Sequence, residues 1–289
     1  METDGRRWLS LLEFAGRSLG QPYGRTFLRH VVLRHPLAVV RGLWKYLGAS
    51  GEQAHRPVPP GEAEDAFVRQ PALGEGRLLV ATGFCQKPLP AEGTDEGCPA
   101  GRFNHQCLSL SNHHADAEQS AWSSTCECCR VRELGQFALE AGASFAILTS
   151  ALDIARDILL PSLVENRFAR VIFAICPYSV EPMRLSLLMC GLEAVLVGYD
   201  SGACADYAQW LRADGGLKPE RTTLAVVDRA RMLRLLHRAA QLRSERGLAQ
   251  PSCFAYRDHV YWPREVTAAN SILAPCPGDS NSAAVEKAA

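Results

Sequence analysis

RVIFAICPYSVEPMRLSLLMCGLEAVLVG, residues 170–198, contains the pattern from which the rest of the fold can be inferred. It begins with one short apolar run, Arg170–Ile175, and ends with another, Ala194–Val197. We expect a helix over Glu181–Cys190 between them, with Gly191 as its C-terminal stop. A strand, a helix and a second strand in this order are typical of two parallel strands joined by a crossover helix.

The same alternation of short apolar runs and helical segments continues along the chain in both directions. The other strands are predicted at Arg77–Thr82, Ser144–Leu148 and Thr222–Val227. The other helices are predicted at Arg130–Ala143, Ala151–Leu163, Ala205–Ala213 and Arg229–Arg246. Continuous apolar strands alternating with helices favour an α/β fold, Rossmann-like, in which a mostly parallel sheet carries helices on both faces.

Changes in composition divide the chain into four segments. Residues 1–50 are expected to form a basic, helical N-terminal arm with a net charge of +5. Pro, Gly and acidic residues indicate a linker over residues 51–76. Residues 77–250 are the expected α/β domain, which is rich in cysteine. Pro, Ser, Asn and Ala predominate over residues 263–289, which we expect to be a disordered tail.

The N-terminal arm combines basic residues with apolar helix faces. Such a segment typically packs on the main domain or on a partner protein. It is also typical of a helix pair that makes peripheral contact with an anionic membrane. Both interpretations of residues 1–50 remain open.

The overall composition narrows the class of protein. The 289 residues carry equal numbers of basic and acidic side chains, so nucleic acid is not an expected partner. Residues 1–16 lack the apolar segment of a secretory signal, and no stretch approaches the roughly 20 apolar residues of a membrane span. We therefore expect a cytoplasmic protein. In a reducing cytoplasm, its eleven cysteines indicate metal or redox chemistry more than disulfides.

Several cysteines follow the ends of predicted strands. Cys85, Cys176 and Cys204 each come shortly after an apolar run. Cys126 and Cys129 begin the helix that joins the first strand to the second, where unpaired N–H groups and the helix dipole favour thiolate. Because parallel strands end, and their crossover helices begin, at one edge of the sheet, we expect these thiols to approach each other there.

Thiolates gathered at one edge predict a metal centre. We assign Cys126, Cys129, Cys176 and Cys204 as ligands of an iron–sulfur cluster, such as a [4Fe–4S] cluster, with Cys85 as a further candidate. Zinc is the alternative metal, although its structural sites more often use compact pairs of ligands than thiols scattered over strand ends.

A second metal site is predicted in CPAGRFNHQC, residues 98–107. Cys98, His105 and Cys107 could form a zinc site, or they could supply further ligands to the first centre. A loop rich in Gly and Pro with incidental thiols is the alternative interpretation.

Three short motifs within residues 126–212 resemble an uncharacterised prokaryotic family. The motifs are Cys126-Glu127-Cys128-Cys129 before a helix, Ala174-Ile175-Cys176-Pro177 at a strand end, and Gly202-Ala203-Cys204-Ala205-Asp206 in a later loop. The family is known only as a domain of unknown function and is taken to bind metal. The resemblance implies a metal site and no known activity.

The function expected from these patterns is electron transfer, or redox chemistry on a small substrate, with a redox protein as partner. A metal-free thiol–disulfide protein that uses Cys126 and Cys129 is the first alternative. A zinc-stabilised scaffold whose basic arm docks on a partner or a membrane surface is the second. Gly83 and Gly202 do not form a G-x-G-x-x-G fingerprint, and no G-x-x-x-x-G-K-[ST] motif occurs, so nucleotide binding has no motif support.

Overall fold

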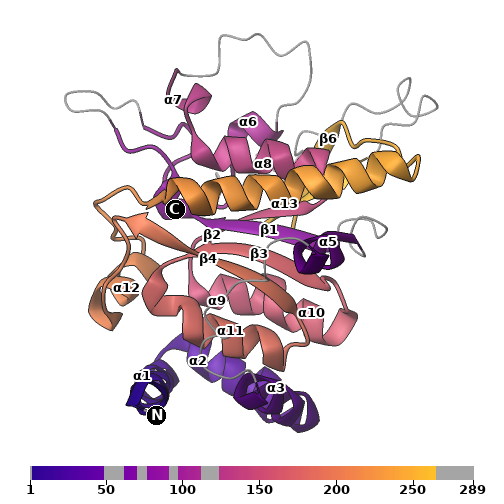
Figure 1. Cartoon of the computed structure of the whole chain (residues 1–289). Helices are drawn as coiled ribbons and strands as arrows, with labels where there is room; N and C mark the ends of the chain where they lie inside the picture. The colour runs from indigo at the N-terminus through magenta and orange to yellow at the C-terminus, as the bar shows by residue number, and fades with distance from the viewer. Residues whose placement is uncertain (1, 49–61, 70–76, 91–96, 112–123, 265–289) are drawn as a thin grey trace, which may run out of the picture.

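The computed structural model describes residues 2–48, 62–69, 77–90, 97–111 and 124–264. A seven-stranded sheet forms the centre of the molecule, in the strand order β5-β4-β3-β1-β2-β7-β6. Helices cover both faces of this sheet (Figure 1). The prediction of an α/β, Rossmann-like fold with a mostly parallel sheet is therefore confirmed.

Four of the strands are parallel and lie side by side. The strands are β1 Leu78–Gly83, β2 Ser144–Leu148, β3 Arg170–Ile175, β4 Glu193–Ser201, β5 Thr223–Leu224, β6 Cys253–Arg257 and β7 Val260–Arg264. β1 pairs in parallel with β2 and β3, and β3 pairs in parallel with β4. β5 adds to β4, β7 to β2 and β6 to β7, each antiparallel to its neighbour. The carboxyl ends of β1, β2, β3 and β4 therefore meet at one edge of the sheet.

The helices form layers on either side of the sheet (Figure 1). One face carries α6 Leu108–Ser111, α8 Arg130–Glu140 and α13 Val226–Glu245. The opposite face carries α9 Ala151–Asp153, η5 Ile154–Leu159, α10 Leu160–Glu165, η6 Pro177–Ser179, α11 Val180–Met189 and α12 Tyr207–Asp214, where η marks a 3-10 or π helix. The remaining helical elements of the α/β domain are α5 Glu62–Arg69, η3 Phe84–Gln86 and α7 Ser124–Glu127. None of the helices in the described residues is long and apolar enough to cross a membrane.

The N-terminal arm is helical, as predicted, and packs below α11 in Figure 1. Its elements are α1 Glu2–Leu19, α2 Pro22–Phe27, η1 Leu28–Val32 and α3 Pro36–Gly48. Gly42 of α3 lies so close to α11 that an added Cβ atom would come within 2.5 Å of the Met189 backbone. One turn later, the buried Tyr46 donates a hydrogen bond of 2.5 Å to Glu181 Oε2 of α11. The arm is therefore a third layer of the same fold.

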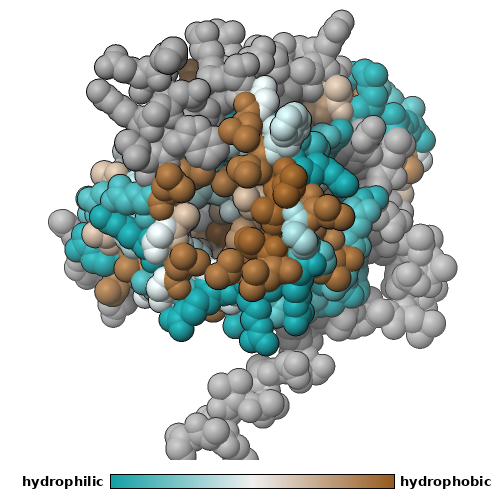
Figure 2. Space-filling view, turned by 90° about the horizontal axis from the view of Figure 1, so that it is seen from below, coloured by the Kyte–Doolittle hydropathy of each residue, from teal (hydrophilic) through white to brown (hydrophobic). Residues whose placement is uncertain are grey.

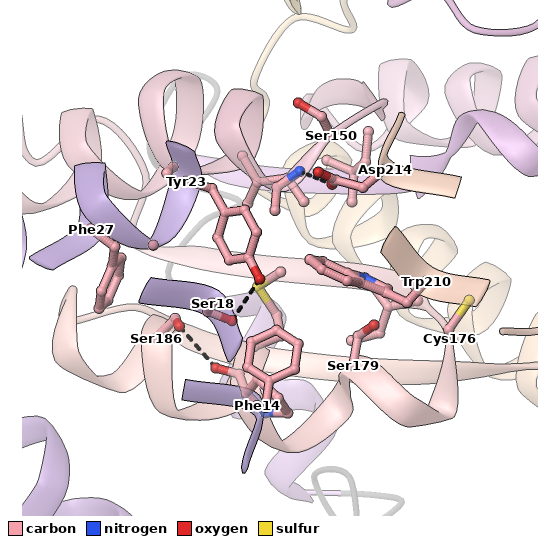
Figure 3. Close-up of a pocket in the computed structure, with 18 of the residues that line it drawn as sticks. Phe14, Ser18, Tyr23, Phe27, Ser150, Cys176, Ser179, Ser186, Trp210 and Asp214 are labelled. Atoms are coloured by element: carbon pink, nitrogen blue, oxygen red, sulfur yellow. Dashed lines mark hydrogen bonds between the residues drawn. The ribbon is translucent and has the colours of Figure 1, made fainter. Parts of the chain in front are cut away.

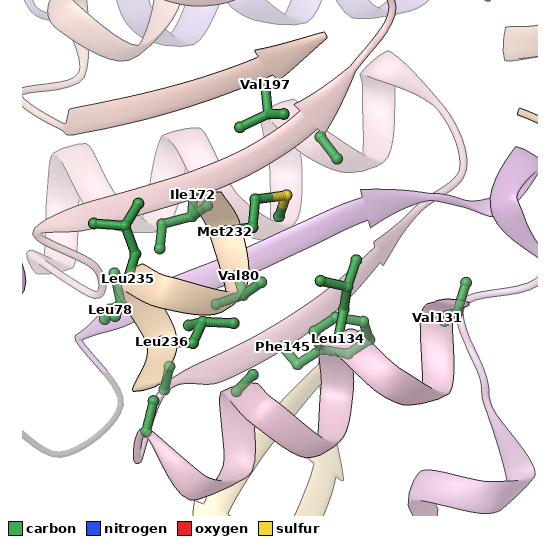
Figure 4. Packing of buried hydrophobic residues seen from close by; sticks show 14 of the residues in the cluster. Leu78, Val80, Val131, Leu134, Phe145, Ile172, Val197, Met232, Leu235 and Leu236 are labelled. Atoms are coloured by element: carbon green, nitrogen blue, oxygen red, sulfur yellow. The ribbon is translucent and has the colours of Figure 1, made fainter. Parts of the chain in front are cut away.

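Alternate side chains of each central strand contribute to two separate cores, because strand side chains point to opposite faces. On β1, Leu78 and Val80 pack toward α8 and α13 (Figure 4). Leu79 and Ala81 pack toward the other face, with side chains of η5 and α11. All four are 2% exposed or less. Burying one large aliphatic side chain contributes about 1.5–3 kcal/mol, so both helix layers hold the sheet.

Two predicted boundaries differ from the structure. The expected strand Thr222–Val227 is reduced to β5, two residues long and antiparallel to β4. Val226 and Val227 instead begin α13, with 81% and 72% of their surface exposed, so their apolar character does not mark a buried strand. Residues 62–69, which fall in the predicted linker, form helix α5.

The β6–β7 hairpin is absent from the sequence prediction. Its turn places Asp258 and His259 at positive φ, 52° and 60°, a conformation for which Asn-Gly or Asp-Gly is the usual signal. Because the turn contains Asp-His instead, the hairpin was not recognisable. Residues 263 and 264, which we expected to begin the disordered tail, end β7, and residues 265–289 lie outside the described part of the chain.

The close approach of α3 and α11 leads to a stability prediction. Gly42→Ala should destabilise the protein by about 1–3 kcal/mol, because the new methyl group must push the two helices apart. Gly16→Ala in α1 is the matched control, since a Cβ atom there meets nothing within 4 Å. The control should gain up to about 1 kcal/mol from the higher helix propensity of alanine. Urea unfolding measures both, and equal stability of the two variants would contradict the packing described.

Candidate functional site

A cavity of about 810 Å³ lies between the N-terminal arm and the carboxyl edge of the parallel strands. Its walls come from α1, α2, η1 and α3, from α9, η5 and α11, and from residues at the ends of β1 and β3. Most of the lining side chains are apolar, among them Leu11, Phe27, Ile154, Leu159 and Met183. Figure 3 shows part of this lining. The cavity has the size and the apolar character of a binding site for a small molecule.

Aromatic rings fasten the arm over one side of the cavity. Phe14 of α1 meets Trp210 of α12 at a ring-centroid distance of 5.3 Å, and Tyr23 of α2 meets the same ring at 5.4 Å. Both pairs are edge-to-face, a favourable arrangement for aromatic rings. The Tyr23 hydroxyl lies 2.5 Å from the Ser18 hydroxyl, and burial raises the pKa of Tyr23. This wall is therefore apolar with a neutral polar centre (Figure 3).

Three thiols line the inner end of the cavity. Cys85 follows β1, Cys176 follows β3 and Cys204 follows β4, and all three are buried. The backbone N–H of Cys204 donates to Cys176 Sγ at 3.3 Å. The Thr222 hydroxyl donates to Cys85 Sγ at 3.0 Å. The structure thus brings together the three single cysteines that follow strand ends.

Tyr199 of β4 fixes the end of β1 beside these thiols. Its hydroxyl oxygen accepts a hydrogen bond of 2.6 Å from the backbone N–H of Gly83 and lies 3.2 Å from the Thr82 hydroxyl. A Cβ atom added at Gly83 would lie 3.0 Å from both Tyr199 Oη and Cys85 Sγ, so this strand end has little room for a side chain. Burial raises the pKa of Tyr199 well above its ordinary value, which keeps the hydroxyl neutral.

The environment of Cys176 favours its thiolate. A hydrogen bond from the Cys204 thiol lowers the pKa of Cys176, and the Cys204 backbone N–H and the Lys218 ammonium act in the same direction against the opposing effect of burial. The pKa of Cys204 is raised, because its proton is held in the hydrogen bond to Cys176 and because it is buried. Cys176 also directly precedes the N-terminus of η6 and α11, where the helix dipole stabilises negative charge. Of the two thiols, Cys176 is therefore the one that ionises more readily.

A carboxyl group on the cavity wall changes charge near neutral pH. Asp214, at the end of α12, accepts a hydrogen bond of 2.5 Å from the backbone N–H of Ala151. Burial raises the pKa of Asp214 to about 6, although this hydrogen bond opposes the shift. The cavity therefore holds a thiol and a carboxyl group whose pKa values are shifted in opposite directions.

Cys129 lies in a different group of thiols, beside Cys98 and Cys107. Lys87, which is 1% exposed, interacts electrostatically with all three. Its ammonium group donates to the carbonyl oxygens of Gly101, Asn104 and Gln106 at 3.0, 2.6 and 2.7 Å. Burial lowers the pKa of Lys87 and raises the pKa of Cys107. The lysine thereby anchors the loop 97–107 to the end of β1.

His105, a predicted zinc ligand, holds the same loop against β2. Its Nδ1 lies 3.0 Å from the Ile147 carbonyl oxygen, and its Nε2 lies 2.9 Å from Thr149 Oγ1. The ring stacks on His259 of the β6–β7 hairpin at a centroid distance of 4.0 Å. Burial lowers the pKa of His105, and Asp153, 3.4 Å away, only partly opposes this. The neutral imidazole links three separate parts of the chain.

The predicted ligands are therefore divided. Cys85, Cys176 and Cys204 line the cavity, whereas Cys126 and Cys129 are buried but are not among its described lining residues. Cys128 of the same motif is exposed. Within the described ranges, no three His, Cys, Asp or Glu side chains are arranged to hold a metal ion. The iron–sulfur and zinc hypotheses stay predictions.

Sequence reasoning missed the groups that complete the cavity. Phe14, Tyr23, Trp210 and Lys218 come from segments that we did not connect with the strand ends. The apolar face of the arm was visible in the sequence, but the surface that it covers was not. The only available signal was the presence of aromatic residues on an amphipathic segment.

Comparison with models of protein families, with curated proteins and with solved structures found no match to this chain.

Proposed function

We propose that this protein binds an apolar or amphiphilic small molecule in the cavity and carries out thiol redox chemistry on it through Cys176 and Cys204. The observation that carries the proposal is the cavity itself, which leads from the arm to a buried thiol pair. A pair with one thiolate and one thiol is suited to a two-electron reaction. The three thiols lie together among lining side chains that are mostly apolar, which would direct the reactive group of a ligand toward them.

The reaction can be written with a quinone-type acceptor as the ligand. The Cys176 thiolate adds to the ring, and Cys204 supplies a proton. The resulting Cys204 thiolate attacks Cys176 Sγ, the sulfur–carbon bond breaks, and the reduced ligand leaves after taking a proton from solvent. Two thiols become one disulfide, and the ligand gains two electrons and two protons. A thiol redox protein would then reduce the disulfide, which gives the protein a redox partner.

An iron–sulfur centre is the second candidate. It is favoured by the position of Cys85, whose buried thiol joins the other two at the ends of neighbouring strands. As placed, the three thiols do not form a group arranged to hold a metal ion. The redox step above is written with the side chains of this chain and the ligand.

Filling the cavity should weaken ligand binding. Ala155→Phe places a ring in the cavity from η5, and Ser186→Phe does so from α11. Each should weaken binding of a hydrophobic fluorescent probe by about tenfold or more, because the probe and the ring compete for the same space. Ala249→Phe, at an exposed position, is the matched control. Unchanged probe affinity in both cavity variants, with urea unfolding showing that they remain folded, would contradict the proposed binding site.

The reactivity of Cys176 should depend on Cys204. Iodoacetamide should alkylate Cys176 faster at neutral pH in the wild type than in Cys204→Ala, because the Cys204 thiol stabilises the Cys176 thiolate. Cys204→Ala removes the thiol hydrogen bond, raises the pKa of Cys176 and should slow its alkylation at neutral pH by about tenfold. Cys204→Ser should lie between the two. Cys190→Ala, a buried thiol elsewhere, is the control. Peptide mass spectrometry measures the alkylation of Cys176, and identical pH profiles in the wild type and Cys204→Ala would contradict the assignment.

Anaerobic purification separates the candidate functions. The thiol redox proposal predicts a colourless protein without stoichiometric metal, in which mild oxidation links Cys176 to Cys204. Broad visible absorbance that disappears in Cys176→Ser would contradict the thiol redox proposal and support the iron–sulfur centre. Stoichiometric zinc in a colourless protein would favour the scaffold. A reducible bond between Cys126 and Cys129 instead would move the redox pair to the sequence motif.

A further inference from the structure

Exposed hydrophobic side chains are concentrated on the N-terminal arm. Of fifteen large hydrophobic residues exposed in the described ranges, eight lie within residues 12–47. These are Leu12, Leu19, Leu28, Leu33, Leu37, Val40, Trp44 and Leu47, which together define the arm face. Figure 2 views the molecule from the side of α1–α3 and shows hydrophobic residues gathered there. Such a patch on a folded protein usually marks an interaction surface.

Helix α3 shows that the outward hydrophobic residues are not needed for its packing. Its inner face, with Gly42 and Tyr46, contacts α11. Leu37, Val40 and Trp44 are 80%, 63% and 78% exposed and follow one another at intervals of three and four residues. This spacing forms a single stripe along the helix. Helix α3 is therefore apolar on two opposite sides, and the fold accounts for only one of them.

The charges around the arm face are almost all positive. Six exposed basic residues lie within residues 11–48: Arg17, Arg25, Arg29, Arg34, Arg41 and Lys45. Glu13 is the only acidic residue of this segment, and it pairs with Arg17 at 2.7 Å. The whole chain has no net charge, so this segment is a local excess of positive charge. Its complement must be an anionic surface.

We propose that the arm face docks on the surface of an anionic lipid bilayer. Leu, Val and Trp side chains would enter the boundary between headgroups and acyl chains, and the surrounding Arg and Lys side chains would pair with anionic headgroups. Trp44 has the amphipathic ring that is enriched at this depth of a membrane. An acidic apolar protein would offer similar chemistry, but the density of cations and the single hydrophobic stripe fit a lipid surface better.

The cavity opens on the same face. Leu12, Leu19 and Leu28 belong to the arm face and also line the cavity, which ends at the buried Cys176. A docked molecule would therefore present the cavity to the acyl chains, and an apolar ligand could enter without crossing water. The docking goes beyond the proposed redox function and holds whether or not the cavity takes a ligand.

Vesicle binding tests the docking. Full-length protein should co-sediment with vesicles of phosphatidylcholine mixed with phosphatidylglycerol, and much less with phosphatidylcholine alone. The double variant Leu37→Ser/Trp44→Ser should lower partitioning by about tenfold or more, because the removed side chains no longer bury apolar surface. Arg34→Glu/Arg41→Glu should lower it by about tenfold on anionic vesicles. Added salt should weaken binding, since exposed charges are screened.

Matched controls keep the test specific. Val226→Ser/Val227→Ser removes two equally exposed hydrophobic residues from α13, and Arg234→Glu/Arg246→Glu reverses two exposed charges outside the arm. Both controls should bind within about twofold of wild type. Unchanged alkylation of Cys176 would establish that the arm variants keep the thiol pair intact, which separates this inference from the redox proposal.

Three results would overturn the docking proposal. The first is wild-type protein that binds neither kind of vesicle. The second is an arm variant and its control that bind equally well. The third is a concentration-dependent dimer that Leu37→Ser/Trp44→Ser abolishes, without vesicle binding, because the arm face would then meet a second copy of this chain.

Discussion

The contact between α3 and α11 is the constraint on which the cavity depends. Because residue 42 has no side chain, the two helix backbones approach closely, and the arm becomes a third layer against the sheet. Aromatic rings of α1 and α12 hold the other end of the arm. Without this layer, apolar groups at the carboxyl edge would face water, at roughly 25 cal/mol for each Å² of surface. The arm covers the open crevice of a Rossmann-like sheet and lines it with apolar side chains.

Burial beneath the arm shifts the pKa values of the polar groups in the cavity. Burial disfavours the ionised form of a carboxyl group, and it raises the pKa of Asp214 to about 6. Cys176 departs from this trend, since the Cys204 thiol and backbone N–H provide hydrogen bonds that burial cannot outweigh. The pKa values of two groups in one cavity are thus shifted in opposite directions, for different physical reasons. Such a separation of pKa values is more typical of a functional site than of a packed core.

The sequence was sufficient for the four parallel strands, but not for the antiparallel strands β5, β6 and β7, and only partly for the site. Arg170–Ile175 and Ser144–Leu148 agree with β3 and β2 because doubly buried strands are continuous apolar runs. Because β1, β3 and β4 are parallel neighbours, Cys85, Cys176 and Cys204, which follow them, lie at the carboxyl edge of the sheet. The partners of Cys129 depend on Lys87, whose burial among carbonyl oxygens leaves no periodic signal in the chain. The packing of the arm over the cavity could not be predicted either, because a hydrophobic helix face does not show which surface it contacts.

Lys87 has a consequence for how this protein can diverge. Its ammonium group has three protons, and three loop carbonyls accept hydrogen bonds from it. Arginine is too large and planar for that space, and methionine would leave the carbonyls without donors. The aliphatic strands can exchange Val, Ile and Leu with little penalty, whereas position 87 has no neutral substitute. Distant relatives should therefore be recognisable by a lysine just after the first strand, even where the rest of the sequence can no longer be aligned.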